Sequence, residues 1–472
     1  MYLTLPINTN YGNDKSPFTI NDLKELCRSQ NTLFDKCILT DFFENYEELY
    51  IDDKRFSDLS LISLRKSNIA DKDKNAFVIK FYKKKINGET HYYIETGQYA
   101  GYIHYKGLTI NLSLSEKYNH TVLNHLLTYA NNISLDSTEI ATGFNKKTNE
   151  LEYLLCFMFV QSLEKASILG LPKKYQNIDA RITMAKGKIN FNSFIKKDIP
   201  FNGKISVQYR DRLDIQEITD VLFYTLTIIK NKFSSQSIFT VRNIYNDLLP
   251  KFSKIKPSTD TIQKAKSNPV LLNPLFMQYK KVIELAELII KELTPDLKKE
   301  NREKITGNLY NTSELFEIYI EKILKNNLKN WQINVQKEIS IYNGLFYKRK
   351  LIPDFVLYNY QKKQYIVLDA KFKTMNYHYY DVDREDIFQL HTYSYFYHDN
   401  LLLAGLIYPL QKQEENHQKH IASTLDKYSN QFGILGIELN KDSTIESIKK
   451  SEIYFTDQIN SLGKTIYKDL HS

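Results

Sequence analysis

Two apolar runs separated by a short polar segment constrain the fold of this chain most. They read IPDFVLY at residues 352–358 and QYIVLDAK at residues 364–371, and their composition is typical of β-strands. We expect them to form an antiparallel hairpin with its turn at Gln361-Lys362. The sequence therefore predicts that the two ends of this segment, PD and DAK, lie side by side.

The register of this hairpin decides which side chains meet. A turn at that position pairs Val356 with Val367 and Asp354 with Asp369. Directly opposed residues have Cβ atoms about 4.5–5.5 Å apart, so two unpaired carboxylates there would repel each other. A divalent cation between them removes the repulsion, and carboxylate oxygens are ligands that Mg²⁺ prefers. We therefore expect a Mg²⁺ site at Asp354 and Asp369, in which Mn²⁺ can substitute.

Such a site suits phosphodiester hydrolysis. Side chains alternate along a strand, so Lys371 lies on the same face as Asp369. The metal would polarise a phosphate and lower the pKa of an attacking water. Lys371 would position that water or stabilise the developing charge. A PD pair or a DxK triplet alone is more often a strand-initiating turn or an ordinary strand end, but the two together, separated by 14 residues, favour a catalytic role.

Two further polar residues are candidates for the same site. SELFEIYIEKILKN is expected to begin a helix at Thr312 or Ser313 and to bury an apolar stripe, with Glu317 at the edge of that stripe. Gln389 lies in REDIFQLHTYSYF, an expected helix after the hairpin, from which its amide could contact DNA or the water. A solvated glutamate and a boundary glutamine are the competing interpretations. Glu317 is thus a third candidate metal ligand and Gln389 a further catalytic candidate.

Local patterns divide the chain into three parts and predict an α+β multidomain protein. Residues 1–145 form a β-rich N-terminal domain, and residues 146–300 a mixed α/β, largely helical middle region. The charged segment 294–307 is the expected linker, and residues 301–472 form the hydrolytic domain. Helices of the middle region are expected at residues 149–169, 215–230 and 274–292.

Glycines mark the expected turns of the N-terminal domain. Residues 76–115 alternate between apolar and polar side chains, as half-buried strands do. An Asn-Gly pair at residues 87–88 predicts a hairpin. Gly97, Gly101 and Gly107 predict further turns.

Composition excludes several classes of protein. The apolar runs at residues 154–160 and 401–408 fall far short of the roughly 20 residues that span a bilayer, and the N-terminus lacks the features of a signal peptide. Three cysteines are too few for a disulfide framework. His378, His391 and His398 lack the spacing of a zinc site. We expect a cytoplasmic protein that does not enter a membrane.

Net charge and nucleotide-binding motifs say less about the function of the chain. The chain carries a net charge of +9, but residues 301–472 hold 22 basic and 21 acidic residues, a net charge of +1. The hydrolytic domain is therefore nearly neutral. A Walker A motif is missing, because the nearest sequence, residues 462–465, lacks the first glycine. We expect that this chain binds no nucleotide itself.

The motifs together resemble a known family. LFE at residues 315–317, PD at 353–354, VLDAK at 367–371 and DIFQLHTY at 386–393 resemble the PD-(D/E)XK nuclease fold as it occurs in the McrC family. That family is the nuclease subunit of McrBC-type, modification-dependent restriction systems. The glycine-punctuated segment 95–113 is similar to the family's N-terminal β motif. The resemblance implies a C-terminal α/β nuclease domain with a central mixed sheet.

The resemblance also implies partners. A McrC-like subunit docks through its N-terminal and central parts onto a hexameric McrB-like AAA+ GTPase, stimulates GTP hydrolysis and cuts double-stranded DNA, which can be methylated. Recognition of the modified base usually belongs to the GTPase subunit. Arg181, Arg210 and Arg212 are the candidates for contacts that stimulate the GTPase, with structural roles at the surface as the alternative.

Two other functions stay open on the sequence alone. The first is a nuclease in another context, either the subunit of a sequence-specific restriction assembly or a nuclease that acts alone. The second is a non-catalytic scaffold that activates a partner NTPase. The presence of Asp354, Asp369 and Lys371 argues against a scaffold.

Overall fold

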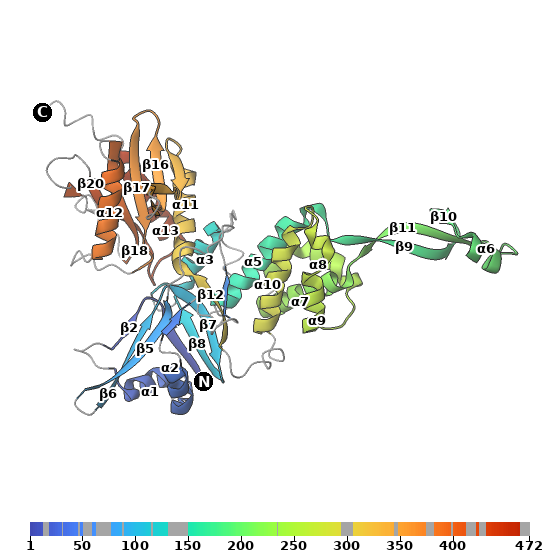
Figure 1. The fold of residues 1–472 in the computed structure, drawn as a ribbon, viewed down its shortest axis with the longest axis horizontal. Coiled ribbons are helices and arrows are strands. Elements are labelled where there is room, and N and C mark those ends of the chain that lie inside the picture. Colours follow the sequence, from blue (N-terminus) through green and yellow to red (C-terminus); the bar gives the residue numbers. More distant parts are fainter. Residues whose placement is uncertain are drawn as a thin grey trace. The chain divides into compact units, whose positions relative to one another are not determined.

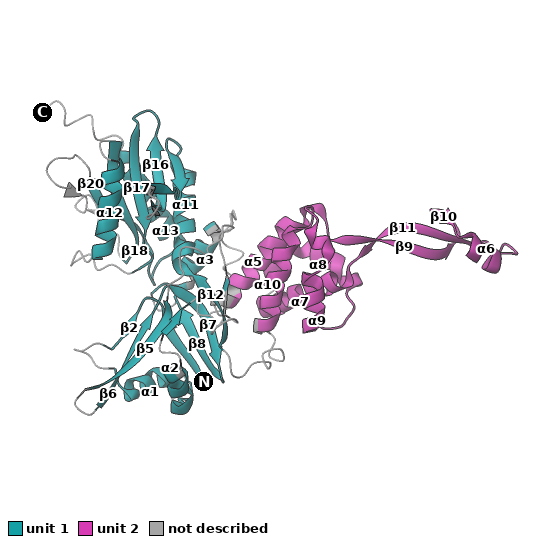
Figure 2. Cartoon of the chain, viewed as in Figure 1, with its two compact units in different colours: residues 1–135, 301–472 teal, residues 136–300 magenta. Residues whose placement is uncertain are grey.

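The chain forms two compact units in the computed structural model (Figure 2). Unit 1 combines Met1–Leu135 with Asn301–Ser472, and unit 2 is Asp136–Glu300. From the sequence we expected domain boundaries after residues 145 and 300. In the structure, the first and third of the three expected parts belong to the same unit. None of the described helices is long and apolar enough to cross a membrane. The structure describes residues 1–12, 18–30, 32–45, 48–50, 59–62, 77–86, 89–114, 117–130, 150–233, 235–293, 305–343, 348–373, 382–397, 400–411, 422–423 and 431–462.

The N-terminal part of unit 1, residues 1–130, is β-rich as the alternation predicted (Figure 1). One sheet has the order β1 (Tyr2–Pro6), β8 (Leu108–Ser113), β7 (Tyr99–Tyr105), β12 (Thr306–Asn311) and β4 (Leu59–Ile62). A second sheet has the order β2 (Asn10–Tyr11), β6 (Glu89–Thr96), β5 (Phe77–Ile86) and β3 (Glu48–Tyr50). The helices are α1 (Ile20–Ser29), α2 (Lys36–Asn45) and α3 (His120–Ala130). Ile86 pairs with Glu89 across the predicted hairpin, whose turn at residues 87–88 lies outside the described residues.

Strand β12 explains why the first and third parts of the chain share a unit. It follows unit 2 in the sequence but pairs antiparallel with β7 and parallel with β4. Its partner opposite Leu309 is Gly101, whose φ is +136°. A Cβ at Gly101 would lie 2.1 Å from the Asn308 carbonyl oxygen. The predicted turn at Gly101 is therefore wrong, because this glycine lies within a strand and permits the close approach of β12.

Two other expectations for this region have different outcomes. Gly107 lies in the predicted turn between β7 and β8, with φ +86°. Most of the predicted linker, residues 294–304, lies outside the described residues. Its last two residues, Thr306 and Gly307, belong to β12.

Unit 2 consists of packed helices and a long antiparallel hairpin (Figure 1). The hairpin strands are β9 (Lys173–Ile182) and β11 (Ile205–Asp214), and β10 (Lys188–Ile189) and α6 (Phe191–Lys197) come between them in the sequence. The packed helices are α5 (Glu150–Ala166), α7 (Gln216–Phe233), α8 (Arg242–Leu248), α9 (Thr259–Lys266) and α10 (Gln278–Leu293). Three of them confirm the predicted helices. Helix α10 begins later than predicted because Asn273 Oδ1 accepts the Leu275 N–H in a preceding turn.

The C-terminal part of unit 1 is built on a six-stranded mixed sheet (Figure 1). Its order is β13 (Gln332–Val335), β16 (Phe355–Asn359), β17 (Gln364–Ala370), β18 (Leu401–Leu410), β20 (Gln431–Glu438) and β19 (Ala422–Ser423). β16 and β17 pair antiparallel with Val356 opposite Val367, in the predicted register. β17, β18 and β20 run parallel. The mixed α+β class with several sheets is thus confirmed.

Helices pack on the strands of this sheet. Helix α12 (Arg384–Tyr397) packs Leu390 and Tyr393 against Val356 and Val367. Helix α11 (Thr312–Asn327) contacts β17, and helix α13 (Ile445–Leu462) contacts β20. A separate hairpin, β14 (Ile339–Asn343) and β15 (Lys348–Leu351), precedes β16. Helices α11 and α12 therefore deliver side chains to the end of the β16–β17 hairpin.

Candidate active site

The two predicted aspartates lie at the same end of the hairpin. Asp354 directly precedes β16, and Asp369 is the penultimate residue of β17. Asp354 Oδ2 accepts the Ala370 backbone N–H at 2.8 Å, so its carboxylate reaches β17. Asp354 is 9% exposed and Asp369 3%. The structure thus brings the two carboxylates together at a buried strand end.

Asp354 lies in a buried and acidic environment. Burial raises the pKa of Asp354 well above its ordinary value, and the charges of Asp369 and Glu317 raise it further. The Ala370 N–H and Lys371 act in the opposite direction but do not outweigh these effects. A buried carboxyl group with two acidic neighbours is a typical feature of a functional site.

Lys371 lies among three acceptors. Its Nζ is 2.7 Å from Asp369 Oδ2 and 3.1 Å from Asp386 Oδ1, and it donates to Gln389 Oε1 at 3.1 Å. Burial alone would lower the pKa of Lys371, but Asp369 and Asp386 outweigh burial and raise it. Lys371 is therefore an ammonium ion at neutral pH. It can donate hydrogen bonds and balance negative charge, but it cannot accept a proton.

Gln389 connects the lysine to an aspartate. In addition to accepting from Lys371, it donates through Nε2 to Asp369 Oδ1 at 3.1 Å and to the Tyr393 hydroxyl at 2.6 Å. The Tyr393 hydroxyl in turn donates to Asp369 Oδ1 at 3.3 Å. The sequence associated Gln389 with the site but expected it to contact DNA or water. Its hydrogen bonds in the structure are with protein side chains that fix Asp369 and Lys371.

Glu317 approaches the site from α11. Asn311 caps this helix, because its Oδ1 accepts the backbone N–H groups of Ser313 and Glu314. Glu317 Oε2 accepts a hydrogen bond from Gln336 Nε2 at 3.1 Å. The Gln336 backbone N–H also donates to the Asp354 carbonyl oxygen at 2.9 Å. Gln336 therefore links the third predicted acid to the backbone of the first.

Asp386 and Lys373 also belong to this cluster, although the sequence did not single them out. Asp386 is 6% exposed, and its Oδ2 lies 2.7 Å from Lys373 Nζ. Burial alone would raise the pKa of Asp386, but Lys373 and Lys371 outweigh it and lower that pKa. Asp386, Gln389 and Tyr393 are three and four residues apart, so they share one face of α12. That spacing is a signal from which Asp386 and Tyr393 could have been found.

The donor set of the site suits a divalent cation. Asp354, Asp369 and Glu317 offer the hard oxygen atoms that Mg²⁺ binds. In the part of the chain that the structure describes, no group of three or more Asp, Glu, His or Cys side chains is arranged around one ion position. Lys371 pairs with Asp369, and Gln336 is bonded to Glu317. The chemistry of the donors therefore fits a divalent cation, while the ligand positions would have to form by movement of these side chains.

Of the histidines considered for zinc, His378 and His398 lie outside the described residues.

The three arginines expected to contact a partner differ in environment. Arg181 Nε donates to Asp198 Oδ1 at 2.5 Å, and its Nη2 donates to the Lys197 carbonyl oxygen and to Asn202 Oδ1, so this side chain has a structural role in the hairpin. Arg210 and Arg212 are exposed on β11. Their guanidinium carbons lie 4.7 and 5.1 Å from the centre of the Tyr175 ring. All three residues are exposed, so each stays a candidate for partner contact.

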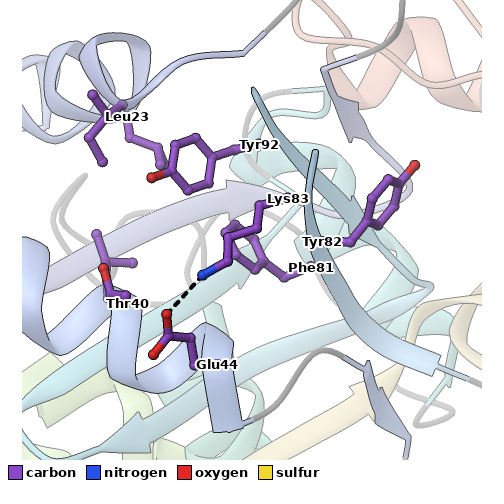
Figure 3. Close-up of a pocket in the computed structure, with 9 residues that line it drawn as sticks. Leu23, Thr40, Glu44, Phe81, Tyr82, Lys83 and Tyr92 are labelled. Carbon is purple, nitrogen blue, oxygen red and sulfur yellow. Dashed lines mark hydrogen bonds and ion pairs between the residues drawn. The ribbon is translucent and has the colours of Figure 1, made fainter. Parts of the chain in front are cut away.

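A pocket in the N-terminal part is too small for a nucleotide (Figure 3). It is lined by side chains such as Leu23, Phe81 and Tyr92, and an ion pair of 2.8 Å joins Lys83 to Glu44 beside it. Its volume of about 40 Å³ accommodates only a few water molecules. Residues 463–465, considered above as a phosphate loop, lie outside the described residues.

A sequence match identifies the family of this chain. The model of the family described as "McrBC 5-methylcytosine restriction system component" matches residues 94–409, which is more than half of the chain. The chain belongs to this McrBC family. The family that the motifs around Asp354 and Lys371 resembled is thereby confirmed. No curated protein matches this McrBC family member.

Solved structures similar to this McrBC family member come from an archaeal complex. A chain in the half-complex of the tetradecameric assembly of Thermococcus gammatolerans McrB AAA+ hexamers with bound McrC superposes with a TM-score of 0.54. The two are 15% identical, and the match covers 98% of this chain and 100% of that one. A chain of the Thermococcus gammatolerans McrBC complex is 13% identical, with a TM-score of 0.33 and coverage of 70% and 89%. The first similarity indicates a shared fold, and the second is too low to bear on it.

Proposed function

We propose that this McrBC family member is the Mg²⁺-dependent DNA endonuclease subunit of a restriction complex that defends a cell against foreign DNA. In this proposal its C-terminal part is a nuclease domain of the PD-(D/E)XK type. It acts together with a McrB-like AAA+ GTPase hexamer, whose GTP hydrolysis it stimulates. Membership in a family of restriction-system components supports this assignment.

The observation that carries the nuclease proposal is the buried cluster at the end of the β16–β17 hairpin. Two carboxylates, Asp354 and Asp369, lie there beside an ammonium group, Lys371, and Gln389 is bonded to both Asp369 and Lys371. A protein that needed only a stable fold would gain little from such a cluster, because burying charged groups is costly. The cluster therefore argues for catalysis and against a purely structural scaffold.

The residues divide the work of phosphodiester hydrolysis among them. A water oxygen forms a bond to phosphorus while a bond from phosphorus to an ester oxygen breaks, so the water loses a proton and the leaving oxygen gains one. Lys371, as an ammonium ion, would donate to a phosphate oxygen or orient the water. Asp354, Asp369 and Glu317 would hold Mg²⁺, which when bound polarises the phosphate and lowers the pKa of the water. Gln389 would hold the side chains of Asp369 and Lys371 in place through its hydrogen bonds to both.

The partner proposal is supported by the hairpin of unit 2. Several large apolar side chains between the end of β9 and the start of β11 are exposed, although proteins rarely expose such groups together unless they bind a partner. They are Met184, Ile189, Phe191, Ile195, Ile199 and Phe201. The similar Thermococcus gammatolerans structure contains McrB AAA+ hexamers with bound McrC. We therefore place the GTPase contact on this hairpin, with Arg210 and Arg212 near its base.

Cleavage by the assembled complex tests the nuclease proposal. The full chain, its McrB-like partner, GTP and Mg²⁺ are mixed with methylated or unmethylated DNA. We expect cleavage that requires all the proteins and Mg²⁺, with Mn²⁺ as a substitute. Asp354→Asn or Lys371→Ala should lower the rate by at least about a hundredfold, because Asp354 would hold Mg²⁺ and Lys371 would stabilise the developing charge. Neither variant should prevent assembly, because neither residue lies in the proposed contact with the GTPase.

Matched controls keep this test specific. Lys362→Ala removes an exposed lysine in the turn at the other end of the same hairpin, and Asp442→Asn removes an exposed aspartate before α13. Both should cleave like the unmodified chain. Cleavage at the unmodified rate by the Asp354 and Lys371 variants would refute the site. A correctly assembled complex that stimulates GTP hydrolysis but cuts neither kind of DNA would support the scaffold instead.

GTP hydrolysis by the partner tests the docking proposal. Replacing both Phe191 and Phe201 with serine should weaken the stimulation of GTP hydrolysis at least about tenfold. Each phenylalanine side chain that the partner buries would contribute roughly 1.5–3 kcal/mol to binding. Phe239→Ser is the matched control, since Phe239 is equally exposed but lies among the packed helices. Equal stimulation by both variants would show that the GTPase binds elsewhere.

A further inference from the structure

Phe372 lies directly between the two lysines of the candidate site. Lys371 and Lys373 both approach Asp386, so they share one side of the chain. Since side chains alternate, Phe372 points the opposite way, and it is only 4% exposed. The position of Lys371 therefore depends on how the Phe372 backbone and ring are held.

The ring of Phe372 lies between two other aromatic rings. Its centroid is 5.2 Å from that of Phe316, which precedes Glu317 on α11. It is also 5.2 Å from that of Tyr118, a buried residue of the N-terminal part, with an interplanar angle of 24°. Aromatic pairs at such distances have a preferred geometry, so they fix orientation as well as burying area. The N-terminal part thus contacts the Phe372 ring through Tyr118.

The backbone of Phe372 is held from the same side. Asn8 Nδ2 donates to the Phe372 carbonyl oxygen at 3.0 Å. Asn8 is itself firmly placed, because its N–H donates to Gly97 at 3.1 Å and its carbonyl oxygen accepts from Lys117 at 3.0 Å. Its φ of +48° belongs to the left-handed region, which asparagine tolerates better than most residues. A fixed amide group therefore holds the carbonyl that follows Lys371.

On the other side, the strand end is held by β18. The Lys371 N–H donates to the Ile407 carbonyl oxygen of β18 at 2.8 Å. Ile407 and Asn8 thus form hydrogen bonds with the backbone of two successive residues, Lys371 and Phe372. Loss of the Asn8 amide would remove the hydrogen bond to the Phe372 carbonyl oxygen, while the Lys371 N–H would stay bonded to β18.

The N-terminal part has other attachments to the C-terminal part. Glu452 on α13 accepts hydrogen bonds from His125 Nε2 at 2.6 Å and from the Tyr129 hydroxyl at 3.0 Å, both on α3. Strand β12 provides a further attachment. A change at Asn8 therefore acts on the Phe372 segment without detaching the N-terminal part.

We propose that Asn8 and Tyr118 are positioning residues for Lys371, which act by holding the carbonyl group and the ring of Phe372. The proposal rests on the proposed function, because Lys371 must act in DNA cleavage for its position to matter. It makes the N-terminal part a component of the proposed nuclease site.

The test compares variants of the full chain in the complex with its GTPase partner, GTP and Mg²⁺. Asn8→Gly removes the amide but keeps the left-handed backbone accessible. We expect its single-turnover cleavage rate to fall about tenfold, with unchanged affinity for DNA, because a small misplacement of a catalytic group lowers the rate and not the binding. Asn10→Gly, at an exposed position two residues further on, is the matched control. Tyr118→Leu should also lower the rate, and Tyr118→Phe, which keeps the ring, should restore it.

A second readout does not depend on activity. Hydrogen exchange of the peptide containing residues 367–373 should speed up in Asn8→Gly and Tyr118→Leu, and stay unchanged in Asn10→Gly. Unmodified cleavage and unmodified exchange in Asn8→Gly and Tyr118→Leu would overturn the proposal. Lys371→Ala separates the two levels: if that variant cuts normally, the proposed function fails, whereas an inactive Lys371→Ala beside a fully active Asn8→Gly means that the positioning role alone fails.

Discussion

A single methyl group at Gly101 should loosen β12 from the N-terminal sheet. Its added Cβ would lie 2.1 Å from the Asn308 carbonyl oxygen, where ordinary contacts lie beyond about 3.4 Å. To restore an ordinary contact, β12 must move by more than about 1 Å, and the backbone hydrogen bonds around Leu309 would weaken. The φ of +136° adds strain, because side-chain-bearing residues rarely adopt it.

The size of the effect follows from these two terms. Backbone strain at such a φ costs about 1–3 kcal/mol. Loss of about two backbone hydrogen bonds adds roughly 1 kcal/mol for each. We therefore expect Gly101→Ala to lower the local stability of β12 by about 3–5 kcal/mol, which corresponds to exchange of its backbone amides at least a hundredfold faster.

Hydrogen exchange of the peptide containing Thr306–Asn311 measures this directly. It is preferable to a melting temperature, because a chain of two units need not unfold in one step. Gly107→Ala is the matched control, since Gly107 also has a positive φ, of +86°, but nothing lies within 4 Å of its added Cβ. Its effect should be about 1 kcal/mol and confined to the turn. Equal protection of β12 in the two variants would refute the close approach at Gly101.

Two further predictions concern charged groups. Asp386→Asn removes a carboxylate that pairs with Lys371, so single-turnover cleavage should fall about tenfold, and a variant that cuts normally would contradict this role. In unit 2, burial alone would raise the pKa of Glu287, but Lys291 and Lys266 outweigh it and lower that pKa below the ordinary 4.5. The unfolded chain then binds a proton before the folded one as pH falls below 4.5, so stability is lost in that range. Glu287→Gln should be less stable at neutral pH, by about 1 kcal/mol, and should lose less stability on acidification; urea unfolding of full-length protein at several pH values measures both, and identical pH curves for the two chains would refute it.

The local pattern of the sequence was sufficient for the β16–β17 hairpin. Its register follows from a short polar turn between two apolar runs, and Asn359 Oδ1 confirms the turn by accepting the N–H groups of Gln361 and Lys362. Since side chains alternate, the register also fixed which face carries Asp369 and Lys371. The two predicted carboxylates lie close together because β16 and β17 pair antiparallel in this register.

Features that depend on distant segments could not be predicted in this way. Pairing of β12 with β7 joins residues about 200 positions apart, and nothing in TGNLYN specifies its partner. Gly101 illustrates the ambiguity, because a glycine within an alternating run signals either a turn or a close approach of another strand. The contact of Asn8 with Phe372 likewise has no local signal. Asp386, in contrast, could have been found, since its spacing from Gln389 marks one helix face.

The placement of β12 has a consequence for how this chain can be divided in the laboratory. A fragment that ends at residue 145 would lack β12, the strand between β7 and β4, so both of these strands would expose unpaired backbone groups. A fragment that begins at residue 301 would carry β12 with no sheet to join. Expression of either half alone is expected to give aggregation. A better design removes only residues 150–293 and joins the flanking segments through a short linker. This keeps β12 beside β7, and it keeps Asn8 and Tyr118 beside Phe372 at the candidate site.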